Sequence, residues 1–163
     1  MKNAAHRHSN IPSSYLILIR ENKILLSLRC NTGFEDGKYS LVAGHCEEGE
    51  TFTQCLIREA KEEVGIELLA GDIQVAHVMH RNSYTPIDNE RVDVFFTAKK
   101  WTGTLENKEP DKCDDLAWFD LDNLPRNTIL YICQAIEMIE AGTFYSEHGW
   151  NSEQKSSIIE RAF

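Results

Sequence analysis

Apolar and polar positions alternate along this chain with two different periods, which predict interleaved strands and helices. Two short β-prone runs, Tyr15–Ile19 and Lys23–Leu28, are separated by a polar turn and are expected to form a hairpin. Similar apolar runs predict further strands at Tyr39–Val42, Ile73–His80, Val92–Ala98 and Leu116–Phe119.

Helical periodicity occurs in two longer segments. From Thr51 to Val64, apolar residues recur three and four positions apart with charges between them, and Gly65 is placed to end this helix in the left-handed conformation. Apolar positions from Ile129 to Ile139 predict a second helix, and a short third one is expected at Ser156–Phe163. The succession predicts an α/β fold with a mixed sheet covered by helices on both sides.

The composition fits one globular domain, which we expect to span residues 1–163, with a core at about 13–142 and a tail at 143–163. The chain is 42% hydrophobic and 26% charged, and it has a formal net charge of −9. An acidic chain lacks the basic face that grips nucleic-acid phosphates or an anionic membrane. We therefore expect neither polymeric nucleic acid nor a membrane as a partner. The excess carboxylates fit either a solvated surface or a cation site.

The cysteines and the N-terminus bear on the compartment. There are five cysteines, without a C-x-x-C pair, and the polar start of the chain has no continuous apolar stretch before the first strand. This usage predicts reduced thiols, no signal peptide and a cytoplasmic location.

One stretch carries acidic residues in a pattern that predicts chemistry. It runs from Gly44 to Ile66, GHCEEGETFTQCLIREAKEEVGI, and satisfies G-x5-E-x7-R-E-U-x-E-E-x-G-U, where U is aliphatic. Glu59, Glu62 and Glu63 share one face of the predicted helix. A Glu- and Lys-rich helix is by itself more often a solvated face. Clustered carboxylates also suit Mg²⁺ or Mn²⁺, which can neutralise a diphosphate and orient a water molecule.

This pattern resembles the signature box of the Nudix hydrolases, and the resemblance extends over about Tyr15–Ile139. Two positions depart from the usual form: Ala60 is small for its aliphatic position, and Val42 stands where members often have proline. The resemblance implies the Nudix fold, an α/β/α sandwich around a mixed sheet. It also implies Mg²⁺, or Mn²⁺, as the cofactor, and homodimers are common among such proteins.

Carried over position by position, the resemblance implies a set of metal ligands, namely Glu59, Glu62, Glu63, the carbonyl of Ala43, and Glu50 from the loop. The implied catalytic group is Glu59, Arg58 and Glu62. In it, Glu59 or a downstream carboxylate takes the proton of the attacking water, and Arg58 orients Glu59. The downstream acid is expected on the loop before the last strand. Glu109 is the candidate, against Asp111 or Glu106, and a plain solvent-exposed acid is equally open.

The family cleaves a nucleoside diphosphate linked to another group, X, which residues outside the box select. Here the stretch Glu109–Cys113, followed by Trp118 and Leu124-Pro125, resembles small nucleoside-triphosphate diphosphatases related to MutT. We therefore expect a small-molecule nucleotide as substrate, a nucleoside triphosphate that is normal or oxidised, which is cleaved to a nucleoside monophosphate and pyrophosphate. Arg29 and Lys112 could reach its phosphates and Trp118 could stack on its base, although such residues are more often surface charges and core.

Two alternatives stay open. Tyr84 lies near the position where diadenosine-polyphosphate hydrolases tend to place a tyrosine, so the substrate could be a dinucleoside polyphosphate or another nucleoside diphosphate conjugate. The second alternative is a Nudix-fold module that binds a nucleotide without cutting it.

Overall fold

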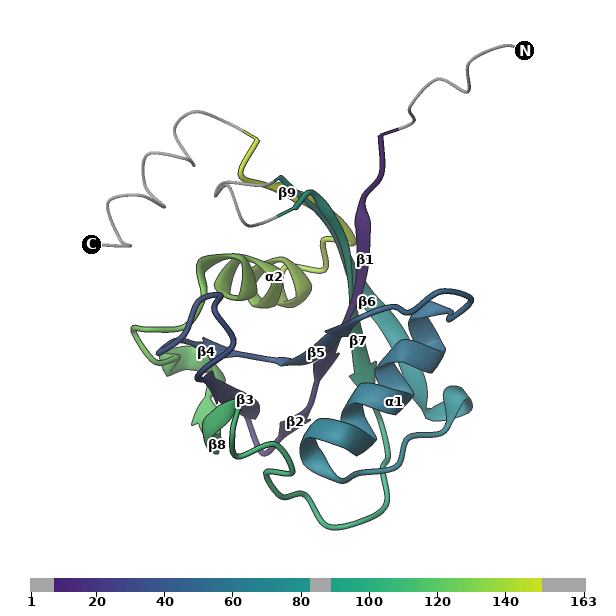
Figure 1. Ribbon diagram of the computed structural model, residues 1–163. Coiled ribbons are helices and arrows are strands. Elements are labelled where there is room, and N and C mark those ends of the chain that lie inside the picture. Colours follow the sequence, from purple (N-terminus) through teal and green to yellow (C-terminus); the bar gives the residue numbers. More distant parts are fainter. Residues whose placement is uncertain (1–7, 83–88, 151–163) are drawn as a thin grey trace.

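The computed structural model describes residues 8–82 and 89–150, and its strands form two sheets (Figure 1). The larger sheet has five strands in the order β5-β1-β7-β6-β9, which are Val42–His45, Ile11–Ile17, Arg91–Ala98, Ile73–Arg81 and Tyr145–His148. Strand β1 pairs antiparallel with β5 and parallel with β7, and β9 pairs parallel with β6. The sheet is therefore mixed, as the sequence predicts.

The smaller sheet is built around β3, Lys23–Arg29. This strand pairs antiparallel with β8, Cys113–Asp120, and with two short strands, β2 at Ile19–Arg20 and β4 at Tyr39–Ser40. Two of the passages between the sheets are made by a single buried residue, Leu18 between β1 and β2 and Leu41 between β4 and β5. The predicted hairpin is thus limited to β2 and β3, because β1 belongs to the other sheet.

Two helices cover opposite faces of the larger sheet, α1 at Phe52–Val64 and α2 at Leu130–Glu140 (Figure 1). Thr51 caps α1: its hydroxyl accepts from the Gln54 amide at 3.2 Å, and the Gln54 side chain accepts from the Thr51 amide at 2.9 Å. Gly65 ends α1 in the left-handed conformation with φ 72°, as predicted. Short 3₁₀ turns, η1 at Ala70–Asp72 and η2 at Leu121–Asn123, precede β6 and follow β8.

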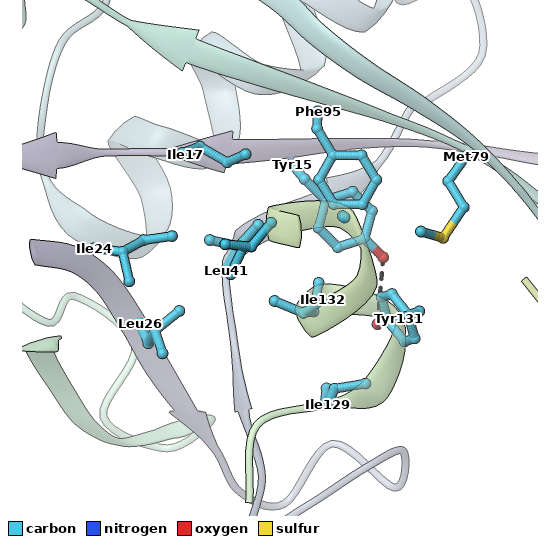
Figure 2. Close-up of a cluster of buried hydrophobic side chains, with 12 residues drawn as sticks. Tyr15, Ile17, Ile24, Leu26, Leu41, Met79, Phe95, Ile129, Tyr131 and Ile132 are labelled. Atoms are coloured by element: carbon cyan, nitrogen blue, oxygen red, sulfur yellow. Dashed lines mark hydrogen bonds between the residues drawn. The ribbon is translucent and has the colours of Figure 1, made fainter. Parts of the chain in front are cut away.

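Alternate residues of β1 and β7 supply the two halves of the core. Tyr15, Ile17 and Phe95 face α2, whereas Leu16 and Phe96 face α1. Figure 2 shows the α2 side, where the ring of Tyr15 stacks on Phe95 and its hydroxyl points to that of Tyr131. Because each face of the sheet is packed by one helix, the α/β/α class expected from the sequence is confirmed.

Other expectations have separate outcomes. Strands β6, β7 and β8 are longer than predicted by one to four residues, β1 begins at Ile11, and β9 is not predicted at all.

None of the five cysteines, all in the described part of the chain, forms a disulfide. None of the helices in residues 8–82 and 89–150 combines the length and apolar character needed to cross a membrane. Tyr84 and the segment Ser156–Phe163 lie outside the described residues.

Candidate active site

The end of β5 and the face of α1 meet at Gly44. A Cβ built on Gly44 would lie 1.8 Å from Oε1 of Glu59, so the Glu59 carboxylate occupies the place that a side chain would take. One turn further along α1, Oε2 of Glu63 accepts a hydrogen bond from the Ala43 amide at 3.1 Å. The two carboxylates are therefore held against the backbone of consecutive β5 residues.

Arg58 joins three of the acidic residues of the box. Its guanidinium makes a two-pronged contact with Glu50, Nε to Oε1 at 2.8 Å and Nη2 to Oε2 at 2.9 Å. Its Nη1 donates to Glu59 at 2.6 Å and to Glu62, four residues further along α1, at 3.2 Å. Nη2 also donates to the carbonyl of His45 at 3.2 Å. One side chain thus ties the loop after β5 to the acidic face of α1.

Three glutamates of the box, Glu50, Glu59 and Glu63, have shifted pKa values, and the shifts differ in direction. The hydrogen bonds from Arg58 lower the pKa of Glu50 to about 2. Burial raises the pKa of Glu59, although Arg58 opposes this shift. Burial, reinforced by the charge on Glu59, raises the pKa of Glu63 to about 8. The pKa of Glu63 therefore lies near neutral pH, whereas Glu50 stays ionised.

Four glutamates line one cavity of about 430 Å³, which we call the carboxylate cavity. Glu59, Glu62 and Glu63 enter it from α1 and Glu109 enters from the loop before β8. Arg29 and Lys112 line the same cavity, and Lys112 Nζ lies 2.8 Å from Glu109 Oε1. Of the three downstream acids considered from the sequence, only Glu109 is among these lining residues, since Glu106 pairs with Lys108 and Asp111 lies elsewhere on the loop.

Three further residues singled out from the sequence have different positions. Ala43 lines the cavity, with its amide bonded to Glu63. Glu50 lies outside the lining, with both carboxylate oxygens on Arg58. Trp118 is also outside it: it packs on the core beside α1, and the guanidinium of Arg20 lies 4.9 Å from its ring centroid.

Sequence reasoning missed a second cavity, of about 190 Å³, beside the first. It is lined by Arg29, Arg81 and Arg91 together with His45, and we call it the arginine cavity. Arg81 ends β6 and Arg91 begins β7, and the two residues are directly opposite in the antiparallel ladder. The signal was available, because two arginines flank the facing ends of adjacent predicted strands, but both fell just outside the predicted boundaries.

The carboxylate cavity has the donors for a hard divalent cation. Its four carboxylates are oxygen ligands of the type that Mg²⁺ and Mn²⁺ prefer. As they stand, no three Asp, Glu, His or Cys side chains in the described ranges converge closely enough to hold a metal ion. Glu62 is 55% exposed, so its carboxylate has room to rotate.

Comparison with known proteins places this geometry in a family. The sequence profile of the NUDIX domain matches residues 10–133. The chain is 32% identical over 120 residues to the NAD-capped RNA hydrolase NudC of Pseudomonas aeruginosa, an alignment that covers 74% of this chain and 40% of that protein. It is 33% identical over 116 residues to the protein of the same name from Vibrio atlanticus, covering 70% of this chain and 39% of that protein. The chain thus spans about two fifths of these relatives.

Solved structures agree with the fold. The MutT NUDIX hydrolase from Burkholderia pseudomallei superposes with a TM-score of 0.73 at 25% identity, over 80% of this chain and 98% of that one. The MutT protein from Methanosarcina mazei Go1 superposes with a TM-score of 0.70 at 18% identity, over 83% and 96% of the two chains. With the profile match over most of its length, the chain belongs to the Nudix hydrolase family.

Proposed function

We propose that this Nudix hydrolase is a Mg²⁺-dependent pyrophosphohydrolase that cleaves a nucleoside triphosphate to a nucleoside monophosphate and pyrophosphate, with Mn²⁺ as an alternative cofactor. The observation that supports this proposal is the carboxylate cavity, where Glu59, Glu62, Glu63 and Glu109 face Arg29 and Lys112. Four carboxylates would repel a polyphosphate unless cations covered them, and the two basic side chains would then meet the outer phosphate oxygens.

The metal would be held by Glu59, Glu62 and Glu63, with Glu109 and the Ala43 carbonyl as further ligands. Glu50 would support the cluster through Arg58, whose position it fixes by two hydrogen bonds. When bound, the cation neutralises phosphate oxygens and lowers the cost of charge on the leaving group.

Side chains of the protein would accept the proton of the attacking water, hold the proton acceptor in position and bind the phosphates. Glu59 would accept the proton from the attacking water, since burial raises the pKa of this carboxyl. The water oxygen would form a bond to phosphorus, and the bond from that phosphorus to the bridging anhydride oxygen would break, which releases pyrophosphate. Arg58 would keep Glu59 in place through its 2.6 Å hydrogen bond, with Glu62 on its other side. Arg29 and Lys112 would bind the phosphates.

A second candidate is the hydrolysis of a nucleoside diphosphate conjugate, including dinucleotides. It is favoured by the relatives from Pseudomonas aeruginosa and Vibrio atlanticus, which are named NAD-capped RNA hydrolases and are 32% and 33% identical to this chain. An NAD-type cap contains the same diphosphate linkage that the carboxylate cavity would cleave. We nevertheless favour a small nucleotide as substrate, because the chain carries a net charge of −9.

A substrate panel tests these proposals. Nucleoside triphosphates, dinucleoside polyphosphates, NAD and sugar nucleotides are incubated with Mg²⁺, and pyrophosphate and phosphate release are measured separately alongside chromatography of the nucleotide products. The proposal expects monophosphate and pyrophosphate from a triphosphate, and no activity in a folded Glu59→Gln variant. Near-normal turnover in that variant would contradict the role of Glu59. Tight nucleotide binding without metal-dependent turnover on any substrate would favour the non-catalytic module.

A further inference from the structure

The arginine cavity adjoins the carboxylate cavity at the end of β5. Arg29, Gly44 and His45 line both, whereas the glutamates line only the first and Arg81 and Arg91 line only the second. Among the described residues that line the arginine cavity there is no aspartate or glutamate. A substrate held at the glutamates would therefore extend one end into surroundings of the opposite charge.

Two arginines of this cavity lie next to each other in the interior of the protein. Arg81 and Arg91 are direct cross-strand partners, and like charges in such a pair repel. Both are at least nine-tenths buried, at 0% and 9% exposure, where charges are poorly screened. Asp93 lies two residues beyond Arg91 on the same face of β7 and pairs with Arg81 at 2.8 Å. The charge of Asp93 interacts with both guanidinium groups.

The guanidinium groups that line the arginine cavity contact aromatic and histidine side chains. The guanidinium groups of Arg29, from the smaller sheet, and Arg91, from the larger one, each lie 5.9 Å from the ring centroid of Phe34. Arg91 also contacts the imidazole of His45. Arg81 lies 4.1 Å above the ring of Tyr131, one of the two tyrosines whose hydroxyls meet in Figure 2. These contacts hold the basic groups before any ligand binds, which lowers the ordering cost of binding.

We propose that the arginine cavity binds an oxyanion of the substrate, a phosphoryl or carboxylate group lying beyond the diphosphate at the carboxylate cavity. The inference rests on the proposed hydrolase function for the placement of that diphosphate. A volume of about 190 Å³ suits one such group, since whole-ligand pockets are roughly 300–1,000 Å³. The oxyanion has two sources, the end phosphate of a triphosphate or an acidic group on X.

Kinetics on matched substrates test this assignment. UDP-glucuronate and UDP-glucose, and NADP⁺ and NAD⁺, differ within each pair by one acidic group, and a nucleoside triphosphate forms a separate arm. Arg91→Gln is expected to raise KM by about 10- to 100-fold for the substrate whose oxyanion enters the cavity, the range for a hydrogen bond between charged groups. A neutral member of a pair should change by less than about twofold. Arg91→Lys should recover part of the loss.

The pattern of KM changes identifies the source. An effect on the triphosphate alone assigns the cavity to its end phosphate, and an effect on UDP-glucuronate or NADP⁺ assigns it to an acidic group on X. Equal effects on acidic and neutral members would mean that an uncharged group occupies the cavity, which overturns the proposal. Arg126→Gln is the control, because Arg126 is exposed and lines neither cavity.

A binding measurement separates this inference from the proposed function. Inorganic phosphate alone is titrated into the metal-free protein by calorimetry. Wild type and Arg126→Gln should bind it alike, and Arg91→Gln should bind at least about tenfold more weakly. Unchanged phosphate binding in Arg91→Gln overturns the proposal even if the enzyme is active. Failure to hydrolyse any anhydride, with this binding difference intact, overturns only the proposed function.

A second variant covers the case in which Arg91→Gln does not fold. His45 is exposed and contacts Arg91, so His45→Glu places a carboxylate against the guanidinium with little change to the core. The same loss of phosphate binding is expected from this variant, and normal binding in a folded His45→Glu contradicts the proposal. Thermal unfolding of each variant establishes that it is folded before either measurement.

Discussion

The Glu59 carboxylate fills the space that a Cβ on Gly44 would need, since that atom would lie 1.8 Å from Glu59 Oε1. The backbone of β5 and the acidic face of α1 are thus in direct contact, and the position of the carboxylate depends on a missing side chain. This explains why the sequence pattern begins with a glycine that is fifteen residues before the glutamate.

Replacing Gly44 by alanine should therefore displace Glu59. A shift of about 1 Å in a reacting group can cost about 100-fold, so we expect kcat to fall by at least that much while the protein stays folded. The check is steady-state kinetics beside thermal unfolding. Gly71→Ala is the matched control, since a Cβ there meets nothing within 4 Å and φ is not positive. Normal kcat in Gly44→Ala would show that Glu59 tolerates displacement.

Glu63 provides a test of the metal site. Its pKa of about 8 reflects burial and the neighbouring charge on Glu59, so a bound cation should be favourable at this carboxylate. Glu63→Gln should raise the Mg²⁺ concentration for half-maximal activity by at least about tenfold, the lower end of what even outer-sphere partners contribute. Glu67→Gln, an exposed residue paired with Lys61 at 3.4 Å, should leave the titration unchanged. Equal Mg²⁺ curves for the two variants would exclude Glu63 as a ligand.

The buried pair between Arg81 and Asp93 sets a stability prediction. Both side chains are 0% exposed, and Arg81 Nε lies 2.8 Å from Asp93 Oδ2. Asp93→Ala would remove the partner of a buried charge, which costs about 3–5 kcal/mol of unfolding free energy. Urea denaturation measures this loss. Asp122→Ala serves for comparison, because the exposed hydrogen bond from Asn22 at 3.0 Å contributes only about 0.5–1.5 kcal/mol. Similar losses in both variants would refute the argument.

His148 should make the protein sensitive to acid. Burial, assisted by the charge on Arg81, lowers its pKa to about 4, and its Nδ1 lies 2.7 Å from Gln134 Oε1. Between about pH 6.5 and pH 4, His148 is therefore neutral in the folded protein but protonated in the unfolded chain. Stability is retained above pH 6.5 and is lost as the pH falls toward 4, by about 2–3 kcal/mol at pH 4.5. His148→Gln should lose less stability than wild type between pH 7 and pH 4.5 in urea titrations. Parallel losses would show that other groups dominate.

The parts of the fold that the sequence predicts are those with a strong local signal. The helix after Thr51 has a capping box, an apolar stripe and a terminal glycine, and it is found within one residue of its predicted start. Strand β1 was predicted too short because Ser13 and Ser14 are polar yet buried. Ser14 Oγ donates to the carbonyl of Phe52 at 2.8 Å, and the local sequence does not predict this tertiary contact.

Strand β9 and the arginine cavity were missed for related reasons. Residues Tyr145–His148 contain no run of apolar side chains, and they form a strand by pairing in parallel with the edge strand β6. Arg81 and Arg91 belong to different strands, and they become neighbours only through the pairing of β6 and β7. The box residues could be predicted because one helix and one loop carry most of them, whereas the arginines depend on sheet assembly.

The division into two sheets decides what sets the spacing of two arginines. Arg29 comes from the smaller sheet and Arg91 from the larger one, and no strand ladder joins β3 to β7. The two guanidinium groups meet at the ring of Phe34, which lies 5.9 Å from each of them. The separation of these two charges therefore depends on how side chains pack between the sheets, and not on the hydrogen-bonded register of either sheet.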